Sequence, residues 1–184
     1  MTRGPTSPPE PDPARAANVL GALALALTDR MAAAVEESSA HSESGAAALS
    51  ALQHFLRDPS IDLLRQVLGL THSGTVRLVD RLEHDGLVRR APGPDGRTTV
   101  VRLTGHGRRA AARVSAARAG LLAAALDVLT PADQEQLTDL AGRVLVGMKR
   151  GAGATRWTCR LCDTGACGRL EGRCPVAGES PPTF

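Results

Sequence analysis

Aromatic side chains are nearly absent from this sequence. They make up 2% of its 184 residues, tyrosine is missing, and only Phe55, Trp157 and Phe184 belong to this class. A core with so few rings must be built from leucine, valine and alanine, and a chain rich in alanine and leucine favours helices over strands. Because hydrophobic residues still make up 42% and charged residues 22%, we expect a globular, mainly helical protein.

Lysine is also nearly missing, so that almost all of the positive charge is carried by arginine. Of 22 basic side chains only Lys149 is a lysine, the formal net charge is +3, and the isoelectric point is about 9.0. Arginine makes the planar, bidentate contacts to phosphate and guanine that lysine cannot make. A codon bias toward arginine and alanine explains the same composition, so the charge is compatible with DNA binding without establishing it.

Long hydrophobic runs are the third absence. No stretch approaches the ~18 continuous apolar residues of a membrane-spanning helix, and the first 13 residues lack the apolar centre of a secretory signal. We therefore expect a cytoplasmic protein without a membrane partner, whose thiols are kept reduced. Residues 1–13 contain five prolines and are expected to form a disordered arm.

The periodicity of apolar residues predicts six helices and one β-hairpin. The helices are expected over 14–37, 46–56, 61–67, 71–85, 104–129 and 131–149, and the strands over 87–91 and 98–103. In the helices apolar residues recur at three- and four-residue spacings. The sequence Pro-Gly-Pro-Asp-Gly between the strands is typical of a turn. The expected fold class is α+β, mainly α with a small hairpin.

This order of elements predicts a winged helix-turn-helix domain with long additional helices. Residues 46–103 are expected to form the DNA-binding part, and residues 14–37 and 104–150 to form dimerisation helices. The apolar stripes of these long helices are too wide for the small winged domain to cover, which favours a homodimer. A separate cysteine-rich segment is expected over residues 151–184.

The helix predicted over 71–85 has one apolar face and one polar face. Thr75, Leu78, Val79 and Leu82 recur at helical spacing and are expected to be buried. The opposite face is free to enter the major groove of DNA, where small residues at the leading end allow close approach and the helix N-terminus attracts phosphate. Its candidate DNA-binding residues are His72, Ser73, Gly74, Arg77 and Arg81. Arg77 is the best candidate for a base contact, and Arg81 for a phosphate contact or a structural salt bridge.

The hairpin adds a second set of candidates. Arg90, Asp95 and Arg97 are its predicted DNA-binding residues. An arginine near the tip of a β-ribbon suits the minor groove, where the negative potential attracts guanidinium groups. Arg97 stands beside the turn and is placed for that contact. A basic face that is merely solvated remains the alternative for each arginine taken alone.

The stretch from Leu63 to Arg90 resembles the core of the MarR family of bacterial regulators. The wing sequence Pro94-Asp95-Gly96-Arg97, followed by Val101-Arg102-Leu103-Thr104-Gly105-His106-Gly107, is similar to the wing of that family. The resemblance implies a homodimer built by the first, fifth and sixth helices and bound to a pseudo-palindromic operator in double-stranded DNA. It also implies a repressor that a small-molecule effector releases, with the arginine at position 97 in the minor groove.

The chain departs from the family pattern at two places. Gly96 takes a wing position that is often charged. The sequence also continues into four cysteines, Cys159, Cys162, Cys167 and Cys174, which the family generally lacks. The spacing C-x2-C-x4-C-x6-C can enclose one tetrahedral metal, so a structural zinc site is the first interpretation. An iron–sulfur cluster and a metal-free thiol-redox sensor remain alternatives.

Two other classes of function compete with a DNA-binding regulator. A thiol oxidoreductase would use the C-x-x-C pair, but that pair normally opens a helix after a strand, and no such unit precedes it here. The five histidines are scattered without a nucleophile beside them, so we expect no enzyme. A winged helix that contacts another protein is the second rival.

Overall fold

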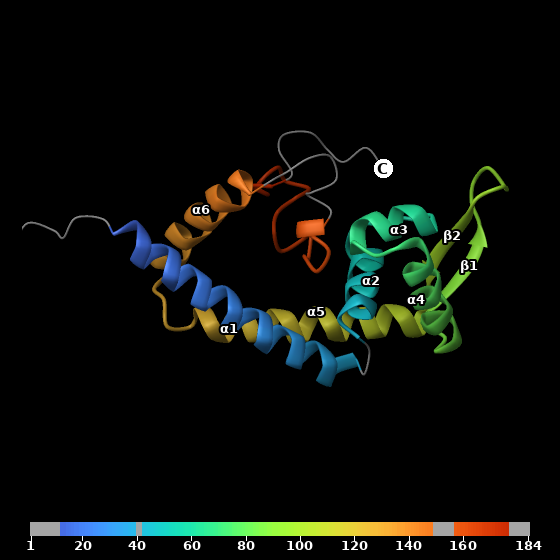
Figure 1. The fold of residues 1–184 in the computed structure, drawn as a ribbon, viewed down its shortest axis with the longest axis horizontal. Coiled ribbons are helices and arrows are strands. Elements are labelled where there is room, and N and C mark those ends of the chain that lie inside the picture. The colour runs from blue at the N-terminus through green and yellow to red at the C-terminus, as the bar shows by residue number, and fades with distance from the viewer. Residues whose placement is uncertain (1–11, 40–41, 149–156, 177–184) are drawn as a thin grey trace, which may run out of the picture.

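The computed structural model describes residues 12–39, 42–148 and 157–176. Figure 1 shows an elongated molecule, in which α1, α5 and α6 extend away from a compact part formed by α2, α3, α4 and a hairpin. The elements are α1 (Pro13–Ser39), α2 (Glu43–His54), α3 (Ile61–Leu68), α4 (His72–His84), β1 (Val88–Pro92), β2 (Thr99–Leu103), α5 (Gly105–Leu126) and α6 (Pro131–Gly147). The predicted fold class, mainly α with a small hairpin, is confirmed.

The compact part is held together by one hydrophobic core. Residues from α2, α3, α4 and both strands meet in it, and Leu49, Leu64, Val79 and Val101 are almost completely buried. The two strands pair in antiparallel orientation, with Val88 opposite Leu103 at the base of the hairpin. Their alternating burial places one face of the hairpin on this core and the other in solvent.

The helix-turn-helix follows from local capping chemistry. Gly69 ends α3 in the left-handed conformation, with a φ of 64°, which costs glycine no steric penalty. Thr71 then begins α4, because its hydroxyl accepts a hydrogen bond of 3.1 Å from the backbone N–H of Gly74. Thr104 and Thr130 cap α5 and α6 in the same way. The three threonines therefore set the start of each of these helices.

Several element boundaries differ from the prediction. Helix α2 begins at Glu43 rather than at residue 46, because the hydroxyl of Ser42 accepts a hydrogen bond from the backbone N–H of Gly45. It ends at His54, two residues earlier than predicted, so the chain has already left the helix before it reaches Pro59. The first strand runs from Val88 to Pro92, one residue later than expected, and α5 ends at Leu126. Residues 1–11, 149–156 and 177–184, where parts of the predicted arm and cysteine segment fall, lie outside the described residues.

The long helices leave many large apolar side chains exposed. Those on α1 and α6 include Val19, Leu20, Leu23, Leu25, Leu137, Leu140, Val144, Leu145 and Val146. By length and composition α1 could cross a membrane, and so could the pair α5 and α6 if their bend of 116° were ignored. The sequence expectation concerned ~18 continuous apolar residues, whereas α1 passes on its length and mean hydropathy. A helix that buries an apolar face in an oligomer can have the same length and composition, so these two properties are weak evidence for a membrane span.

The junction between the hairpin and α5 is unusually close. A methyl group built on Gly107 would lie 1.8 Å from the backbone oxygen of Leu87, so only glycine fits there. The hydroxyl of Thr104 also donates a 2.6 Å hydrogen bond to the backbone oxygen of Gly86. These contacts fix the direction in which α5 leaves the winged part.

Gly107→Ala is expected to lower the free energy of unfolding by about 1–3 kcal/mol or more, because the added methyl group must push α5 away from the hairpin. Gly120→Ala is the matched control on the same helix, since nothing lies within 4 Å of a methyl group there. That control should raise the free energy of unfolding by about 0.5–1 kcal/mol. Urea unfolding followed by circular dichroism measures both; equal effects of the two changes would contradict the close junction.

Candidate DNA-binding surface and cysteine cluster

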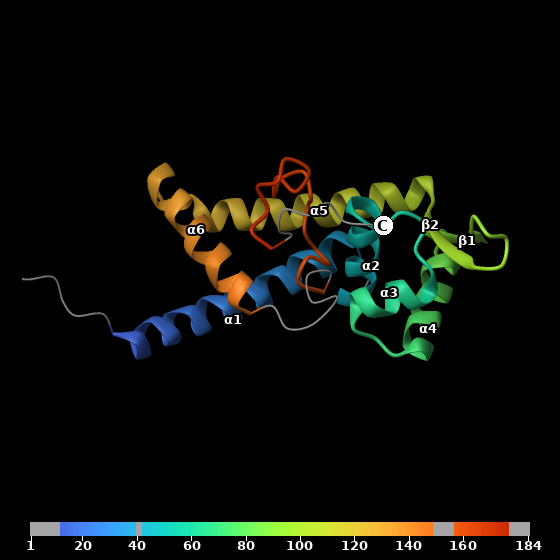
Figure 2. The ribbon, with the colours of Figure 1, turned by 90° about the horizontal axis from the view of Figure 1, so that it is seen from above.

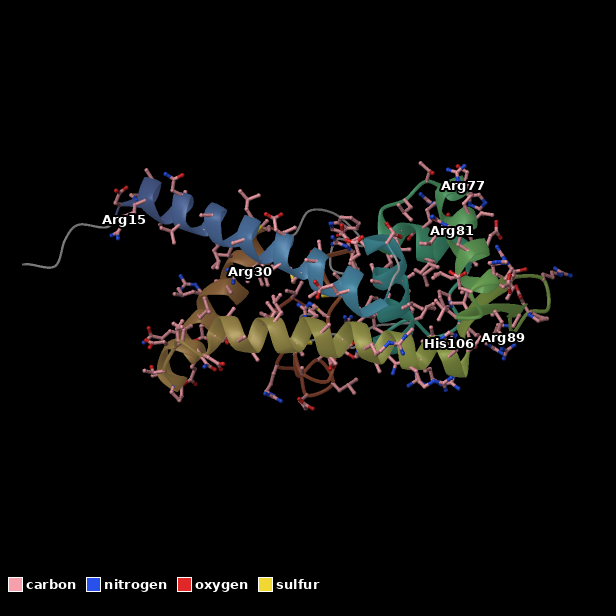
Figure 3. The ribbon with its side chains drawn as sticks, turned by 90° about the horizontal axis from the view of Figure 1, so that it is seen from below. Arg15, Arg30, Arg77, Arg81, Arg89 and His106 are labelled. Carbon is pink, nitrogen blue, oxygen red and sulfur yellow. The ribbon has the colours of Figure 1, made fainter. Side chains whose placement is uncertain are left out.

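Helix α4 is buried on one face and exposed on the other, as the sequence predicts. Its inward-facing residues Thr75, Leu78, Val79 and Leu82 are at most 3% exposed. On the other face His72, Ser73, Arg77 and Arg81 are exposed, and Gly74 is partly covered. In Figure 3 the side chains of Arg77 and Arg81 lie next to each other at the outer edge of the compact part.

Two arginines on this face are available to a ligand. Neither Arg77 nor Arg81 forms an ion pair with any part of the chain that the structure describes, so the salt bridge considered for Arg81 is absent there. Gly74 is confined by the capping hydroxyl of Thr71, 3.0 Å from where a Cβ would lie. The free backbone N–H groups of the first helical turn add partial positive charge at the same end.

Arg90 makes contacts within the protein that the sequence does not predict. Its guanidinium group binds the carboxylates of Glu83 and Asp80 on α4, the latter at 2.6 Å, and its backbone N–H donates to Glu83 at 2.7 Å. These hydrogen bonds hold the pKa of Glu83 below its ordinary value. The side chain is therefore occupied within the protein. We reinterpret Arg90 as a positioning residue that ties the outer end of α4 to the hairpin.

Asp95 also acts within the protein. One of its carboxylate oxygens accepts hydrogen bonds from the backbone N–H groups of Thr98 and Arg97, at 2.9 and 3.1 Å, and the other accepts from the hydroxyl of Thr98. The bonds from Thr98, with that from Arg97, lower the pKa of Asp95. Gly96 between them has a φ of 65°. Asp95 thus shapes the turn, and the side chain of Arg97 is exposed beside it.

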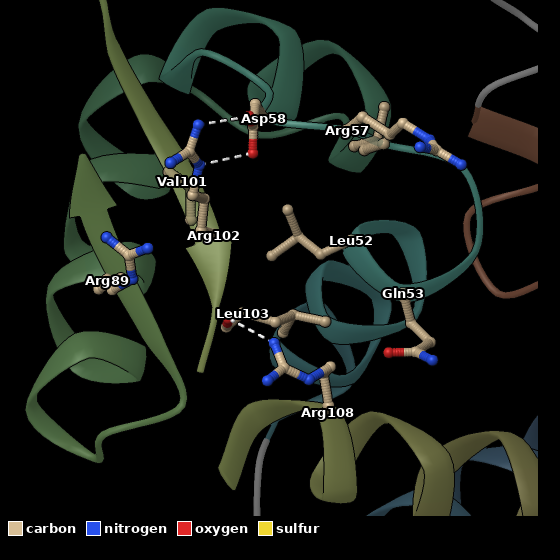
Figure 4. A pocket seen from close by; sticks show the side chains of 10 residues that line it. Leu52, Gln53, Arg57, Asp58, Arg89, Val101, Arg102, Leu103 and Arg108 are labelled. Atoms are coloured by element: carbon tan, nitrogen blue, oxygen red, sulfur yellow. Dashed lines mark hydrogen bonds and ion pairs between the residues drawn. The ribbon is translucent and has the colours of Figure 1, made fainter. Parts of the chain in front are cut away.

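A pocket of about 510 Å³ lies where α2 and the start of α5 meet the hairpin (Figure 4). Four of its lining residues are arginines: Arg57, Arg89, Arg102 and Arg108. Arg102 is held by Asp58, whose pKa is lowered by that hydrogen bond, and Arg108 donates to the backbone oxygen of Leu103 at 3.2 Å. Arg57 and Arg89 are exposed. The wall of the pocket is therefore strongly basic.

The four cysteines are neighbours in space and all carry free thiols. Cys159 and Cys174 are buried, while Cys162 and Cys167 are half-buried. Electrostatic interactions link Cys159 with Cys162 and Cys174, and link Cys167 with Cys174 and Cys162. Yet among the residues described, no three His, Cys, Asp or Glu side chains have the geometry to hold a metal ion. Metal binding would therefore have to draw the thiols together.

The charge around these thiols favours a thiolate. A hydrogen bond from the thiol of Cys159, together with the positive charges of Arg118, Arg169 and Arg160, lowers the pKa of Cys162 to about 6. The same hydrogen bond and burial raise the pKa of Cys159. The Nε of Arg169 is buried and has no hydrogen-bond partner among the described residues. An anionic metal–thiolate group beside this Nε–H would supply the missing hydrogen-bond acceptor.

The comparisons with known proteins agree with this geometry. Residues 46–98 match the sequence profile of the MarR family. Among solved structures, a MarR family protein from Bacillus stearothermophilus is 23% identical with a TM-score of 0.67, and covers 74% of this chain and 95% of its own. RV1404 from Mycobacterium tuberculosis is 23% identical, with a TM-score of 0.63 and coverages of 78% and 99%. No curated protein sequence matches.

A third solved structure has a functional title. MepR, a transcription regulator of the Staphylococcus aureus multidrug efflux pump MepA, is 14% identical with a TM-score of 0.62, and covers 72% of this chain and 98% of its own. The chain therefore has the fold of MarR-family transcription regulators. The neighbours whose titles state a role are titled as transcriptional regulators, in agreement with the prediction that this chain is not an enzyme.

Sequence reasoning missed the internal partners of the candidate residues. Glu83 and Arg90 stand seven residues apart on different elements, and only their opposite charges at the helix–strand junction could have indicated the contact. Arg118 reaches the cysteines from α5, 44 residues earlier in the chain, and no local pattern predicts that approach. Trp157, which contacts the turn between α3 and α4, was also not identified.

Glu83→Gln is expected to lower the free energy of unfolding by about 1 kcal/mol at pH 7, because the variant keeps the shape but loses the charge that binds Arg90. Since the pKa of Glu83 is lowered on folding, this stabilisation is complete above its ordinary value of 4.5 and is lost as the pH falls below it. Urea unfolding between pH 3 and 7 should show the two proteins converging at low pH. A difference that is constant over this range would contradict the ion pair.

Proposed function

We propose that the protein is a MarR-family transcription regulator that binds a specific operator in double-stranded DNA. The observation that carries the proposal is the exposed face of α4, where Arg77 and Arg81 have no ion pair in the described structure and stand above an apolar face fixed in the core. The width of the major groove admits such a helix. Ser73 and Gly74 at its leading end let the backbone approach the base edges.

The hairpin supplies the second contact in this proposal. The turn shaped by Asp95 presents the exposed side chain of Arg97 at the far end of the wing. An arginine there fits the narrow minor groove beside the major groove that α4 occupies. Arg90 and Asp95 contribute indirectly, because Arg90 holds α4 against the hairpin and Asp95 shapes the turn that carries Arg97. His72 is exposed at the start of α4 and is assigned to a backbone or base contact.

We further propose that the functional unit is a homodimer built by α1, α5 and α6. The exposed apolar side chains of α1 and α6 support it, because a second copy would remove them from water. Two copies present two α4 helices for a pseudo-palindromic site, with half-sites spaced by whole turns of DNA. A dimer that covers a promoter in this way acts as a repressor in the cytoplasm.

A small-molecule effector belongs to the same proposal. The pocket at the base of the hairpin has the size of ligand sites in general, which range over about 300–1,000 Å³. Its exposed Arg57 and Arg89 favour an acidic compound, such as a carboxylate. The pocket borders the hairpin, so that a ligand bound there would change the position of the wing.

We assign the four cysteines to one zinc ion. Four sulfur ligands are the set that structural zinc sites use, and the adjacent arginines stabilise the thiolates. An iron–sulfur cluster or a redox-active set of disulfides would use the same residues. Metal analysis and the visible spectrum of protein purified without oxygen distinguish the three: zinc is colourless and stoichiometric, a cluster absorbs visible light, and a redox pair holds no metal.

Arg77→Ala and Arg97→Ala are each expected to weaken operator binding by about 1–3 kcal/mol. The probe is a duplex selected from a random-sequence pool by the wild-type protein, and the measurement is fluorescence anisotropy at several salt concentrations. Arg143→Ala, which removes an exposed arginine of α6 far from α4 and the hairpin, is the control and should bind as the wild type does. Unchanged affinity after both Arg77→Ala and Arg97→Ala would refute the groove contacts.

Leu140→Glu is expected to convert the dimer into a monomer, because it places a charge within the apolar face of α6. Leu140 is 56% exposed in the single chain, so the variant should still fold. Leu170→Glu is the control, since Leu170 is 87% exposed on the cysteine segment and should not affect assembly. Sedimentation velocity measures the change; a wild-type protein that sediments as a monomer at micromolar concentration would contradict the proposed interface.

A further inference from the structure

The described part of the cysteine-rich tail, residues 157–176, is here called the cysteine segment. Figures 1 and 2 show it between α6 and α2, alongside α5. It therefore lies between the helices assigned to dimerisation and the part assigned to DNA binding. Its contacts with both parts suggest a role beyond the binding of a metal.

One end of the segment contacts the turn of the helix-turn-helix. A Cβ atom built on Gly69 would lie 2.6 Å from Cζ3 of Trp157, so the indole ring lies directly on the backbone of that turn. The guanidinium group of Arg160 stacks on the same ring, 3.9 Å from its centroid, and donates to the backbone oxygen of Trp157 at 3.1 Å. Arg160 is in turn 3.7 Å from the carboxylate of Glu43 on α2.

The middle of the segment is attached to the end of α2. The hydroxyl of Thr164 donates a 2.9 Å hydrogen bond to the backbone oxygen of His54, and Asp163 lies 3.6 Å from Nδ1 of the same histidine. The other ring nitrogen of His54 is 2.9 Å from the hydroxyl of Ser115 on α5. Leu161 packs against the core of the winged part. This portion therefore joins α2, α5 and the core.

The other end of the segment contacts α6. Gly142 is the buried residue of that helix, and a Cβ atom built there would lie 3.0 Å from Cβ of Pro175. Val176, the next residue, is 4% exposed. Trp157 stands two residues before the first cysteine, and Pro175 follows the last one directly. The four cysteines thus lie between the contact with the turn and the contact with α6.

The backbone already brings these cysteines toward each other. The N–H of Cys162 donates to the backbone oxygen of Cys159 at 2.9 Å, and Gly168 and Gly172 reverse the chain with φ values of 63° and 70°. The unpartnered Nε of Arg169 gives a positively charged donor beside the thiols. Four sulfur donors beside arginine are a set that zinc uses. The thiols do not have metal-binding geometry in the described structure, so zinc binding would draw them together and thereby fix both ends of the segment.

We propose that zinc bound by the four cysteines braces the DNA-binding part against α6, and that this brace raises the affinity for DNA. The proposal rests on the proposed function, since it describes how that DNA binding is regulated. The partner is a thiophilic divalent cation, and the transmitting contact is the one between Trp157 and the Gly69 turn. Loss of the metal frees both ends of the segment.

The direction of the effect follows from the geometry of a dimer on DNA. Two α4 helices can enter successive grooves only when their separation matches the helical repeat. A brace that ties each α4, through its preceding turn, to the dimerisation helix α6 reduces the range of separations that the free protein samples. Less conformational entropy is then lost on binding, and the affinity rises.

The experiment compares zinc-loaded protein with protein stripped by a chelator and returned to metal-free buffer. The DNA is the duplex selected by the wild-type protein, and metal content is measured in parallel. We expect one zinc per chain in the loaded form and binding about tenfold tighter than in the stripped form, within the 5–150-fold range usual for coupled sites. Emission from Trp157, the one tryptophan of the chain, should shift to longer wavelength on stripping, because the indole leaves the turn.

Trp157→Ala separates the brace from the metal site. Trp157 is 44% exposed, so its truncation should leave the fold intact. The variant should keep one zinc per chain but bind DNA equally in the loaded and stripped forms. Leu170→Ala is the control on the same segment and should keep the full zinc effect. Cys162→Ser should lose the metal and bind as stripped wild type does.

Three results would overturn the proposal. They are equal affinity of loaded and stripped wild-type protein, tighter binding after stripping, and a full zinc effect in Trp157→Ala. Wild-type protein that contains no zinc would overturn it as well. None of these results affects the proposed DNA binding, which fails if no sequence is selected or if the duplex is bound without dependence on Arg77 and Arg97; protein without zinc would remove only the assignment of the cysteines to that metal. The two failures are therefore distinguishable.

Discussion

The burial of one face of α4 is the constraint on which the rest of the structure depends. Thr75, Leu78, Val79 and Leu82 lie in the core, and this fixes which side of the helix faces outward. The exposed arginines follow from that orientation rather than from any interaction of their own. Arg90 adds a second constraint, because its hydrogen bonds to two carboxylates hold the outer end of α4 against the hairpin. Helix and wing therefore form one rigid unit.

Two further devices connect this unit to the long helices. On one side, the close contact of Gly107 with the backbone of Leu87 sets the direction of α5. On the other, the cysteine segment joins the turn before α4 to α6 through Trp157 and Pro175. The first device is permanent, because it consists of backbone packing. In our proposal the second depends on the metal bound by four thiols, which would make it suited to regulation.

The parts of the fold that the sequence predicts are those governed by local chemistry. Thr71, Gly69 and the apolar period of α4 act within a few residues of each other, so the helix-turn-helix could be predicted closely. Ser42 gives an equally local capping signal, and because of it α2 begins earlier than the apolar period alone predicts. The sequence identifies the arginines, but it does not tell which of them are bound within the protein. The carboxylates that bind Arg90 come from another element. The contact of Trp157 with Gly69 joins residues far apart in the chain, and no pattern in the sequence indicates it.

The central claim is that two copies of α4 read one DNA site. Footprinting of the purified protein on the duplex that it selects from a random pool tests this most directly. The account predicts two inverted half-sites whose centres are separated by about 10–10.5 base pairs or a multiple of that spacing, bound by one dimer. Selection that enriches no sequence, or a footprint with a single unrepeated half-site, would contradict it.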